Sequence, residues 1–183
     1  MKVIGIVGMP GSGKSEAADV ARSMDIPVVN MGDIIRKEVS ESGLESAPET
    51  LRSMMVRLRK KFGKGIVAEQ CLPLIRSLGS HGIVAVDGLR SLEEVGVFRR
   101  EFPNFKVIAI HSSPKMRHER LKERHRSDDP RTWQEFIERD KLELSIGIGQ
   151  VIALADVVVS NEGTHAGFRE EVKKSILKVT IDD

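Results

Sequence analysis

The sequence predicts an α/β protein with three layers, in which helices cover both faces of a parallel five-stranded sheet. Five short runs rich in valine and isoleucine recur along the chain, at residues 3–7, 26–29, 83–86, 105–110 and 157–159. These runs are almost entirely apolar, which is typical of strands that are buried on both faces. Longer segments compatible with helices separate the runs, and this alternation indicates parallel βαβ units.

The size and composition of the chain predict a single domain over residues 1–183, because 183 residues of which 40% are hydrophobic can bury one sizeable core. The 29 Lys and Arg residues against 27 Asp and Glu leave a net charge of +2, which is too balanced to indicate a nucleic-acid-binding surface. No apolar stretch is long enough to cross a bilayer, and the lone Cys71 fits a reducing compartment. We predict a soluble, cytoplasmic protein with no membrane contact and no evident obligate protein partner.

Two connections between strands are longer than a simple crossover requires. The first, residues 31–80, contains helix-like pieces at 49–62 and 66–78, and the second, residues 114–140, is rich in arginine. Ligands of open α/β sheets bind beyond the carboxyl ends of the strands, where both connections can reach. We predict that the first forms a helical, acceptor-binding insertion and that the second forms a short lid.

The motif G-x-x-x-x-G-K-S follows the first predicted strand and precedes a helix-compatible segment, which is the context that a P-loop requires. Its glycines let successive N–H groups turn toward phosphate, and the helix adds its positive end. The predicted ATP-binding residues here are Gly8, Pro10, Gly11, Ser12, Gly13, Lys14, Ser15 and Glu16. A plain glycine-rich turn is the alternative interpretation.

The P-loop assigns chemistry to particular side chains. Lys14 is expected to bridge the β- and γ-phosphates, and the Ser15 hydroxyl is expected to bind Mg²⁺. Asp87 ends the third predicted strand, where it is placed to hold the same metal directly or through water. A strand-end turn formed by Asp87 and Gly88 is the alternative.

Three further segments carry a resemblance to known enzymes. Residues 30–36 read Asn-Met-Gly-Asp-Ile-Ile-Arg, residues 87–90 read Asp-Gly-Leu-Arg, and residues 155–163 read Ala-Asp-Val-Val-Val-Ser-Asn-Glu-Gly. Together with the P-loop, they resemble the nucleoside monophosphate kinases and the dephospho-coenzyme A kinases over nearly the whole chain. The chain looks most similar to an archaeal-type family of nucleotide-kinase-like proteins.

The resemblance implies an acceptor site. Arg36 would grip the acceptor phosphate, and Asp33 would cap the same helix one turn earlier. Arg90 would contact this phosphate too, although its segment is one residue shorter than the adenylate kinase counterpart and lacks the proline. Asp87 belongs to this predicted substrate site as well. A capped helix with a solvated arginine and a surface salt bridge are the alternatives for Arg36 and Arg90.

The second insertion concentrates arginines. If its first part is helical, Arg117, Arg120 and Arg124 are spaced i, i+3, i+7 and project from one face, which suits a triphosphate. By the resemblance, Arg120 stacks near the ATP base, Arg124 contacts the transferred phosphate and Arg139 returns from the other side of the lid. The predicted catalytic residues are Lys14, Arg120, Arg124 and Arg139, because forked guanidinium groups stabilise charge on the phosphoryl oxygens. A solvated helix face with ion pairs is the alternative.

The segment after the last predicted strand is expected, by resemblance to dephospho-coenzyme A kinases, to lie against adenine through backbone groups of Asn161 and Gly163. A helix-capping turn, with Thr164 as a possible cap, is the alternative.

The predicted function is Mg²⁺-assisted transfer of the γ-phosphate of ATP to a small nucleotide-type acceptor, either a nucleoside monophosphate or dephospho-coenzyme A. An ATP-driven switch or assembly factor on the same fold is the main alternative. RNA binding by the lid ranks last, because the chain has no tyrosine and few other aromatic residues on which bases could stack.

Overall fold

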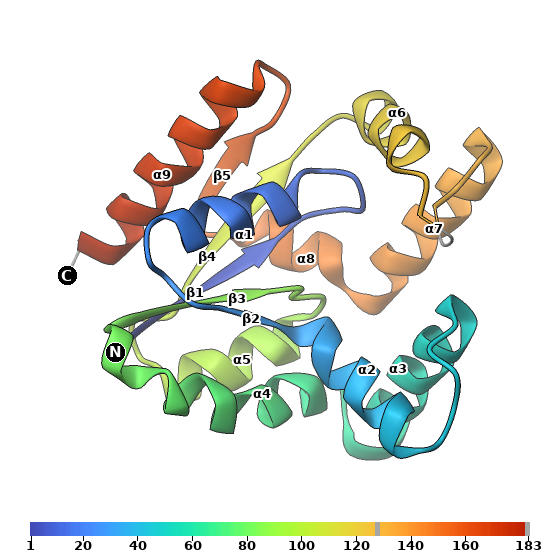
Figure 1. The fold of residues 1–183 in the computed structure, drawn as a ribbon, viewed down its shortest axis with the longest axis horizontal. Coiled ribbons are helices and arrows are strands. Elements are labelled where there is room, and N and C mark those ends of the chain that lie inside the picture. Colours follow the sequence, from blue (N-terminus) through green and yellow to red (C-terminus); the bar gives the residue numbers. More distant parts are fainter. Residues whose placement is uncertain (127–128, 182–183) are drawn as a thin grey trace.

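The computed structural model describes residues 1–126 and 129–181, and its centre is one five-stranded sheet. The strands are β1 (Lys2–Val7), β2 (Val28–Asn30), β3 (Ile83–Asp87), β4 (Lys106–His111) and β5 (Val157–Ser160). They lie in the order β2-β3-β1-β4-β5, and every neighbouring pair is parallel (Figure 1). The predicted five-stranded parallel sheet is confirmed.

The second strand begins later than predicted, at Val28 rather than Ile26. The Ile26 amide donates to the Ala21 carbonyl at the end of the preceding helix, 3.1 Å away, and Pro27 has no amide hydrogen to offer. Both residues therefore belong to the connection rather than to the sheet.

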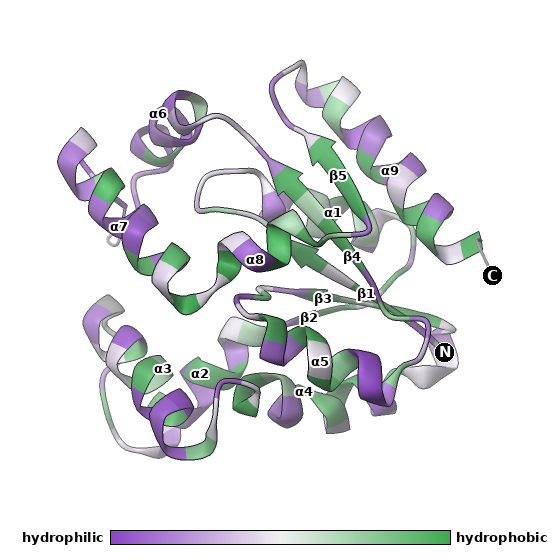
Figure 2. Cartoon of the chain, turned by 180° about the vertical axis from the view of Figure 1, so that it is seen from behind, coloured by the Kyte–Doolittle hydropathy of each residue, from purple (hydrophilic) through white to green (hydrophobic). Residues whose placement is uncertain are grey.

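The central strand β1 supplies two separate cores, because alternate side chains point to opposite faces. Val3 and Val7 pack in a core with residues of α4 (Ile66–Ser77), α5 (Leu92–Glu101) and α8 (Ile148–Ala153). Ile4 and Ile6 pack in the other, with α1 (Lys14–Ser23) and α9 (His165–Ile181). Figure 2 shows the apolar strands between these two helical layers, so the predicted three-layer arrangement is confirmed.

The first long connection forms three helices and a short 3₁₀ turn. Helix α2 (Met31–Glu41) and helix α3 (Pro48–Phe62) extend beyond the sheet, whereas α4 covers it and the 3₁₀ turn Gly79–His81 leads into β3. Cys71 is buried on α4, and burial raises the pKa of its thiol to about 12, as suits the structural thiol of a packed helix.

The second long connection forms α6 (Pro114–Arg124) and α7 (Trp133–Ile146), and residues 127–128 of this predicted lid lie outside the described part. Trp133 stacks on Phe136 at 5.1 Å and meets His118 edge-on, so an aromatic cluster joins the two helices. Figure 1 shows α2 and α3 on one side, and α6 and α7 on the other, at the same end of the sheet. Within the described residues, no helix is long and apolar enough to span a membrane.

Candidate functional site

A cavity of about 500 Å³ opens at the carboxyl ends of β1 and β3, between the two pairs of helices. It brings together the P-loop, the end of β3 and the arginines of both insertions. The predicted site residues that line it are Gly8, Pro10, Gly11, Gly13, Lys14, Ser15, Glu16, Arg36, Asp87, Arg90, Arg120, Arg124 and Arg139. Ser12, Asp33, Asn161 and Gly163 do not line it, and Arg126 and Glu143 line it without having been predicted.

The P-loop adopts the backbone that its glycines permit. Gly11 has φ +80° and Gly13 has φ +107°, and a side chain on Gly13 would approach the Nδ2 atom of Asn161 to 2.3 Å. Gly13 also begins α1 without any side-chain cap, so the first N–H groups of the helix are left to an outside acceptor. This end of α1 is suited to bind phosphate.

Lys14 is partly buried at the cavity, and its Nζ donates to the carbonyls of Gly8, at 2.6 Å, and Met9, at 3.3 Å. Burial lowers the pKa of Lys14 to about 8, although the carboxylates of Asp87 and Glu143 oppose the shift. The two carbonyls are neutral acceptors, so the ammonium group is only partly compensated. An anionic group entering the cavity would complete its environment.

Asp87 ends β3 at the same cavity, and the exposed Ser15 begins α1 beside Lys14. Within the described chain, the Oδ1 atom of Asp87 and the hydroxyl of Ser12 are buried without a hydrogen-bond partner. Burial raises the pKa of Asp87, while the positive charges of Lys14 and Arg90 act against the shift. The Asp87 carboxylate, with its unused oxygen, and the Ser15 hydroxyl line the same cavity and fit Mg²⁺, which prefers one or two carboxylates together with phosphate and water oxygens.

Arg117 differs from its prediction, because only 4% of its surface is exposed. Its guanidinium forms two bonds to Asp140, of 2.8 and 2.5 Å, and also donates to the Pro10 carbonyl at 3.1 Å. It also lies over the ring of Phe136 at 4.8 Å. The residue therefore joins α6 to α7 and to the P-loop instead of facing a triphosphate with Arg120. Which side of α6 is buried depends on its contacts with α7. The spacing of the arginines along α6 gives no information about these contacts.

Arg120 and Asn161 form a second set of contacts that links α6 to the P-loop through the segment after β5. Arg120 donates to the Ser112 hydroxyl at 2.7 Å and to the Asn161 carbonyl at 2.8 Å. The Asn161 side chain donates to the Ser12 carbonyl at 2.9 Å, and its backbone N–H donates to His111 at 2.8 Å. Both backbone groups of Asn161 are thus used inside the protein rather than being open toward adenine.

Gly163 is exposed and does not line the cavity; it lies in the turn before α9. The hydroxyl of Thr164 accepts from the Gly167 amide at 3.2 Å, so the capping alternative describes this segment. Glu16 lines the cavity, but its carboxylate pairs with Arg169 and, at 3.1 Å, with His165. Burial alone would raise the pKa of Glu16, and hydrogen bonds from Arg169 and His165 hold it below its ordinary value.

Asp129 is a site residue that sequence reasoning did not assign. Its side chain is 4% exposed and accepts from Arg124 Nε at 2.9 Å, from Arg139 at 3.3 Å and from the Arg126 amide at 3.0 Å. Burial alone would raise the pKa of Asp129, but these hydrogen bonds and charges hold it below its ordinary value. Asp129 therefore gathers two of the predicted catalytic arginines of the lid, Arg124 and Arg139. An acidic residue within an arginine-rich stretch was the available signal.

On the acceptor side, Asn30 rather than Asp33 caps α2, because its side chain accepts from the Gly32 amide at 2.8 Å. The helix begins at Met31, which leaves Asp33 inside the first turn, where it pairs with Arg36. The prediction of Asp33 as a cap was therefore wrong by one turn. Asn30 itself lines the cavity.

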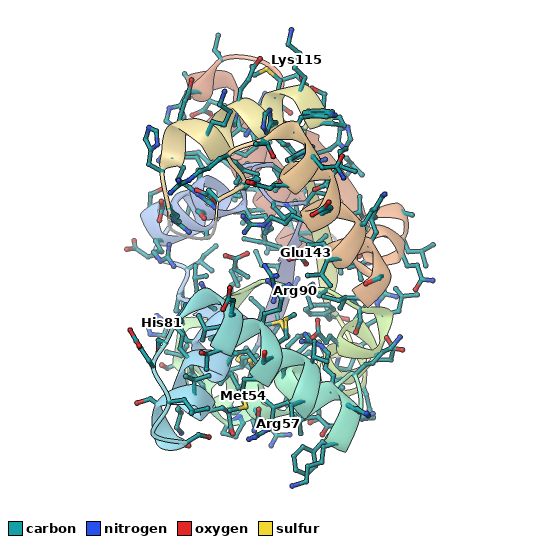
Figure 3. The ribbon with its side chains drawn as sticks, turned by 90° about the vertical axis from the view of Figure 1, so that its right-hand side faces the viewer. Met54, Arg57, His81, Arg90, Lys115 and Glu143 are labelled. Atoms are coloured by element: carbon teal, nitrogen blue, oxygen red, sulfur yellow. The ribbon has the colours of Figure 1, made fainter. Side chains whose placement is uncertain are left out.

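Arg90 lines the cavity and contacts helices on both sides of it. Its Nε donates to Glu143 of α7 at 3.1 Å (Figure 3). Its Nη1 lies 3.2 Å from the sulfur of Met55 on α3. Its backbone N–H donates to the fully buried Glu94 at 2.7 Å, and Arg59 of α3 donates to the same carboxylate at 2.5 Å. Glu94 thus ties the turn that carries Arg90 to the first insertion.

Sheet order, P-loop and arginine-lined cavity define a P-loop protein with a kinase-like fold, and residues 7–136 match the model of a family described as AAA domain. The chain belongs to the UPF0200 family. It is 48% identical over 180 residues to the UPF0200 protein of Pyrococcus horikoshii, an alignment that covers 97% of each chain.

Solved structures share the fold. TT1252 from Thermus thermophilus has a TM-score of 0.68 at 20% identity and covers 96% of both chains. A dephospho-CoA kinase from Campylobacter jejuni has a TM-score of 0.62 at 16% identity, with 99% of this chain and 98% of that chain covered. The resemblance to P-loop nucleotide kinases that the sequence suggested is confirmed.

Proposed function

We propose that this protein transfers the γ-phosphate of ATP to a small nucleotide-type acceptor, a nucleoside monophosphate or dephospho-coenzyme A. The observation that carries the proposal is that Arg36 and Arg90, from the acceptor side, line the same cavity as Lys14, Arg124 and Arg139. A protein that only hydrolysed ATP to drive a conformational change would have no need of two arginines opposite the P-loop.

The chain supplies binding and charge stabilisation. The N–H groups at the start of α1 and the ammonium of Lys14 hold the β- and γ-phosphates, and Arg36 and Arg90 orient the acceptor. As the bond from the γ-phosphorus to ADP breaks, ADP leaves with the electron pair and an acceptor oxygen forms the new bond. A phosphate oxygen of a nucleoside monophosphate carries no proton at this step, whereas the hydroxyl of dephospho-coenzyme A releases its proton to water. Arg124 and Arg139 stabilise the charge on the phosphoryl oxygens during this exchange.

The remaining roles concern metal and water. Ser15 and Asp87 would hold Mg²⁺, which when bound neutralises phosphate charge. Arg120, which lines the cavity and donates to the Asn161 carbonyl, would contact the donor nucleotide. Closure of the α6–α7 lid would exclude water, which otherwise competes with the acceptor and leads to hydrolysis.

A coupled assay of ADP release with AMP, CMP, UMP and dephospho-coenzyme A tests the proposal. We expect saturable ADP release that depends on one of these acceptors and that is lost in a correctly folded Lys14→Ala variant. Slow ATP hydrolysis that no acceptor changes would contradict the kinase proposal and favour an ATP-driven switch. Retained transfer by Lys14→Ala would contradict the assignment of the phosphate site.

A further inference from the structure

A second cavity of about 350 Å³ adjoins the first and lies between α2, α3 and α7. The two cavities share Gly32, Arg36, Arg90, Arg126, Arg139 and Glu143, so they form one continuous space. Residues of α3, including Arg52, line the second cavity but not the first. We call this second space the acceptor cavity, and Arg52 marks its end away from the P-loop.

The acceptor cavity carries more positive charge than one phosphate monoester requires. Five guanidinium groups line it, from Arg36, Arg52, Arg90, Arg126 and Arg139, against the single carboxylate of Glu143. Like charges gathered in a partly enclosed space repel one another, and a bound anion relieves this repulsion. The cavity is therefore built for a ligand with several negative charges.

Ion pairs within the protein compensate three of the five groups. Arg36 pairs with Asp33, Arg90 with Glu143, and Arg139 with Asp129. No hydrogen bond or ion pair of the Arg52 or Arg126 side chain to another residue is found in the described chain.

These two uncompensated guanidinium groups belong to different elements. Arg52 lies on α3, whereas Arg126 follows the end of α6. Arg126 lines both cavities, whereas Arg52 lines the acceptor cavity alone, so an anionic group beside Arg52 would be distinct from the phosphate that Arg36 and Arg90 are proposed to hold.

The rest of the lining is aliphatic. Ile35, Leu51, Met55 and Leu142 contribute side chains, and Ser46 adds one hydroxyl. The lining, as far as the structure describes it, contains no aromatic ring and no Asn or Gln side chain. Stacking on rings and amide hydrogen bonds, which proteins use to read bases, have no counterpart here. A nucleotide-type acceptor would therefore place its anionic groups, rather than its base, in this cavity.

We propose that the acceptor carries at least two separate anionic groups, phosphate or carboxylate, and that Arg52 binds the group farther from the P-loop. This inference rests on the proposed kinase function and specifies the acceptor class of the same site. The inference predicts that acceptors with two anionic groups bind more tightly than acceptors with one.

Calorimetric binding of two matched pairs tests the inference, with the P-loop saturated by Mg²⁺ and a non-hydrolysable ATP analogue. The pairs are AMP with adenosine 3′,5′-bisphosphate, and glycerol 3-phosphate with 3-phosphoglycerate. The first pair adds a phosphate and the second a carboxylate, which distinguishes the two anion sources. We expect the compound with two anionic groups to bind about tenfold more tightly in at least one pair.

Arg52→Ala is expected to remove this preference, and Arg57→Ala is its matched control. Arg57 lies on the same helix, is exposed and lines neither cavity, and Figure 3 shows it far from Arg90 and Glu143. Equal affinities within both pairs, or a preference that persists in Arg52→Ala, would overturn the inference. A preference that depends on Arg52 in a protein that transfers phosphate to no acceptor would instead overturn the kinase proposal and support the binding assignment.

Discussion

Replacing Lys14 by methionine should stabilise the nucleotide-free protein while removing its function. The partly buried ammonium group of Lys14 donates its hydrogen bonds to the carbonyls of Gly8 and Met9. Its pKa is lowered by burial from 10.5 to about 8. Each unit corresponds to about 1.4 kcal/mol, so holding the charged form in the folded state costs about 3 kcal/mol at pH 7.

The net gain should be smaller than this cost, because the methionine side chain forms neither hydrogen bond. We expect Lys14→Met to raise the free energy of unfolding by about 1–3 kcal/mol at pH 7. For a chain of this size, each kcal/mol corresponds to roughly 2–4 °C in the unfolding midpoint. Methionine has a similar length and an unbranched stem, so it fills the same space.

The dependence on pH identifies the cause. Between pH 8 and about pH 10.5 the unfolded chain binds more protons at Lys14 than the folded chain does, so this residue makes the stability of the parent rise with pH. The advantage of Lys14→Met should therefore fade across this window and be small near pH 10.5. Denaturant unfolding of both proteins at pH 7, 8.5 and 10, without nucleotide, measures the difference.

Two results would refute this reasoning. A variant that is less stable than the parent at pH 7 would mean that the carbonyl hydrogen bonds outweigh the cost of burying the charge. A constant stability difference from pH 7 to pH 10 would mean that the ionisation of Lys14 is not its source. Addition of ATP and Mg²⁺ should stabilise the parent and leave Lys14→Met unchanged.

Three other substitutions test separate parts of the site. Arg36→Ala should raise the KM for the acceptor about tenfold and change the KM for ATP much less, in initial rates with each substrate varied. Asn161→Ala removes the buried bond to the Ser12 carbonyl and should lower the free energy of unfolding by about 1–3 kcal/mol in denaturant titrations. Asp129→Asn removes the carboxylate that orders Arg124, so kcat should fall about tenfold while the calorimetric Kd for ATP changes less.

Each of these predictions has a contrary outcome. An equal rise of both KM values would place Arg36 outside the acceptor site, and an Asn161→Ala variant of unchanged stability would show that this bond does not brace the P-loop. Unchanged kcat in Asp129→Asn would mean that the carboxylate has no part in positioning the lid arginines. Arg57→Ala serves as a common control, because this exposed side chain lines neither cavity.

The sequence by itself determined the sheet and the phosphate loop. The apolar run of β1, the glycine spacing of the loop and the start of α1 are adjacent in the chain, so their geometry follows from local backbone rules. Asp87 was placed at the cavity for a related reason, since the ends of neighbouring parallel strands meet at one edge of the sheet.

Only the tertiary structure decided which side of each lid helix faces the cavity. Arg117 and Arg120 share one helical stripe in sequence, yet Asp140 of α7 holds the first in the interior while the second reaches the loop at Asn161. The ion pair between Arg90 and Glu143 likewise depends on how α7 packs near the turn after β3. The rotation of a helix is set by contacts with residues distant along the chain, and a local spacing pattern carries no information about them.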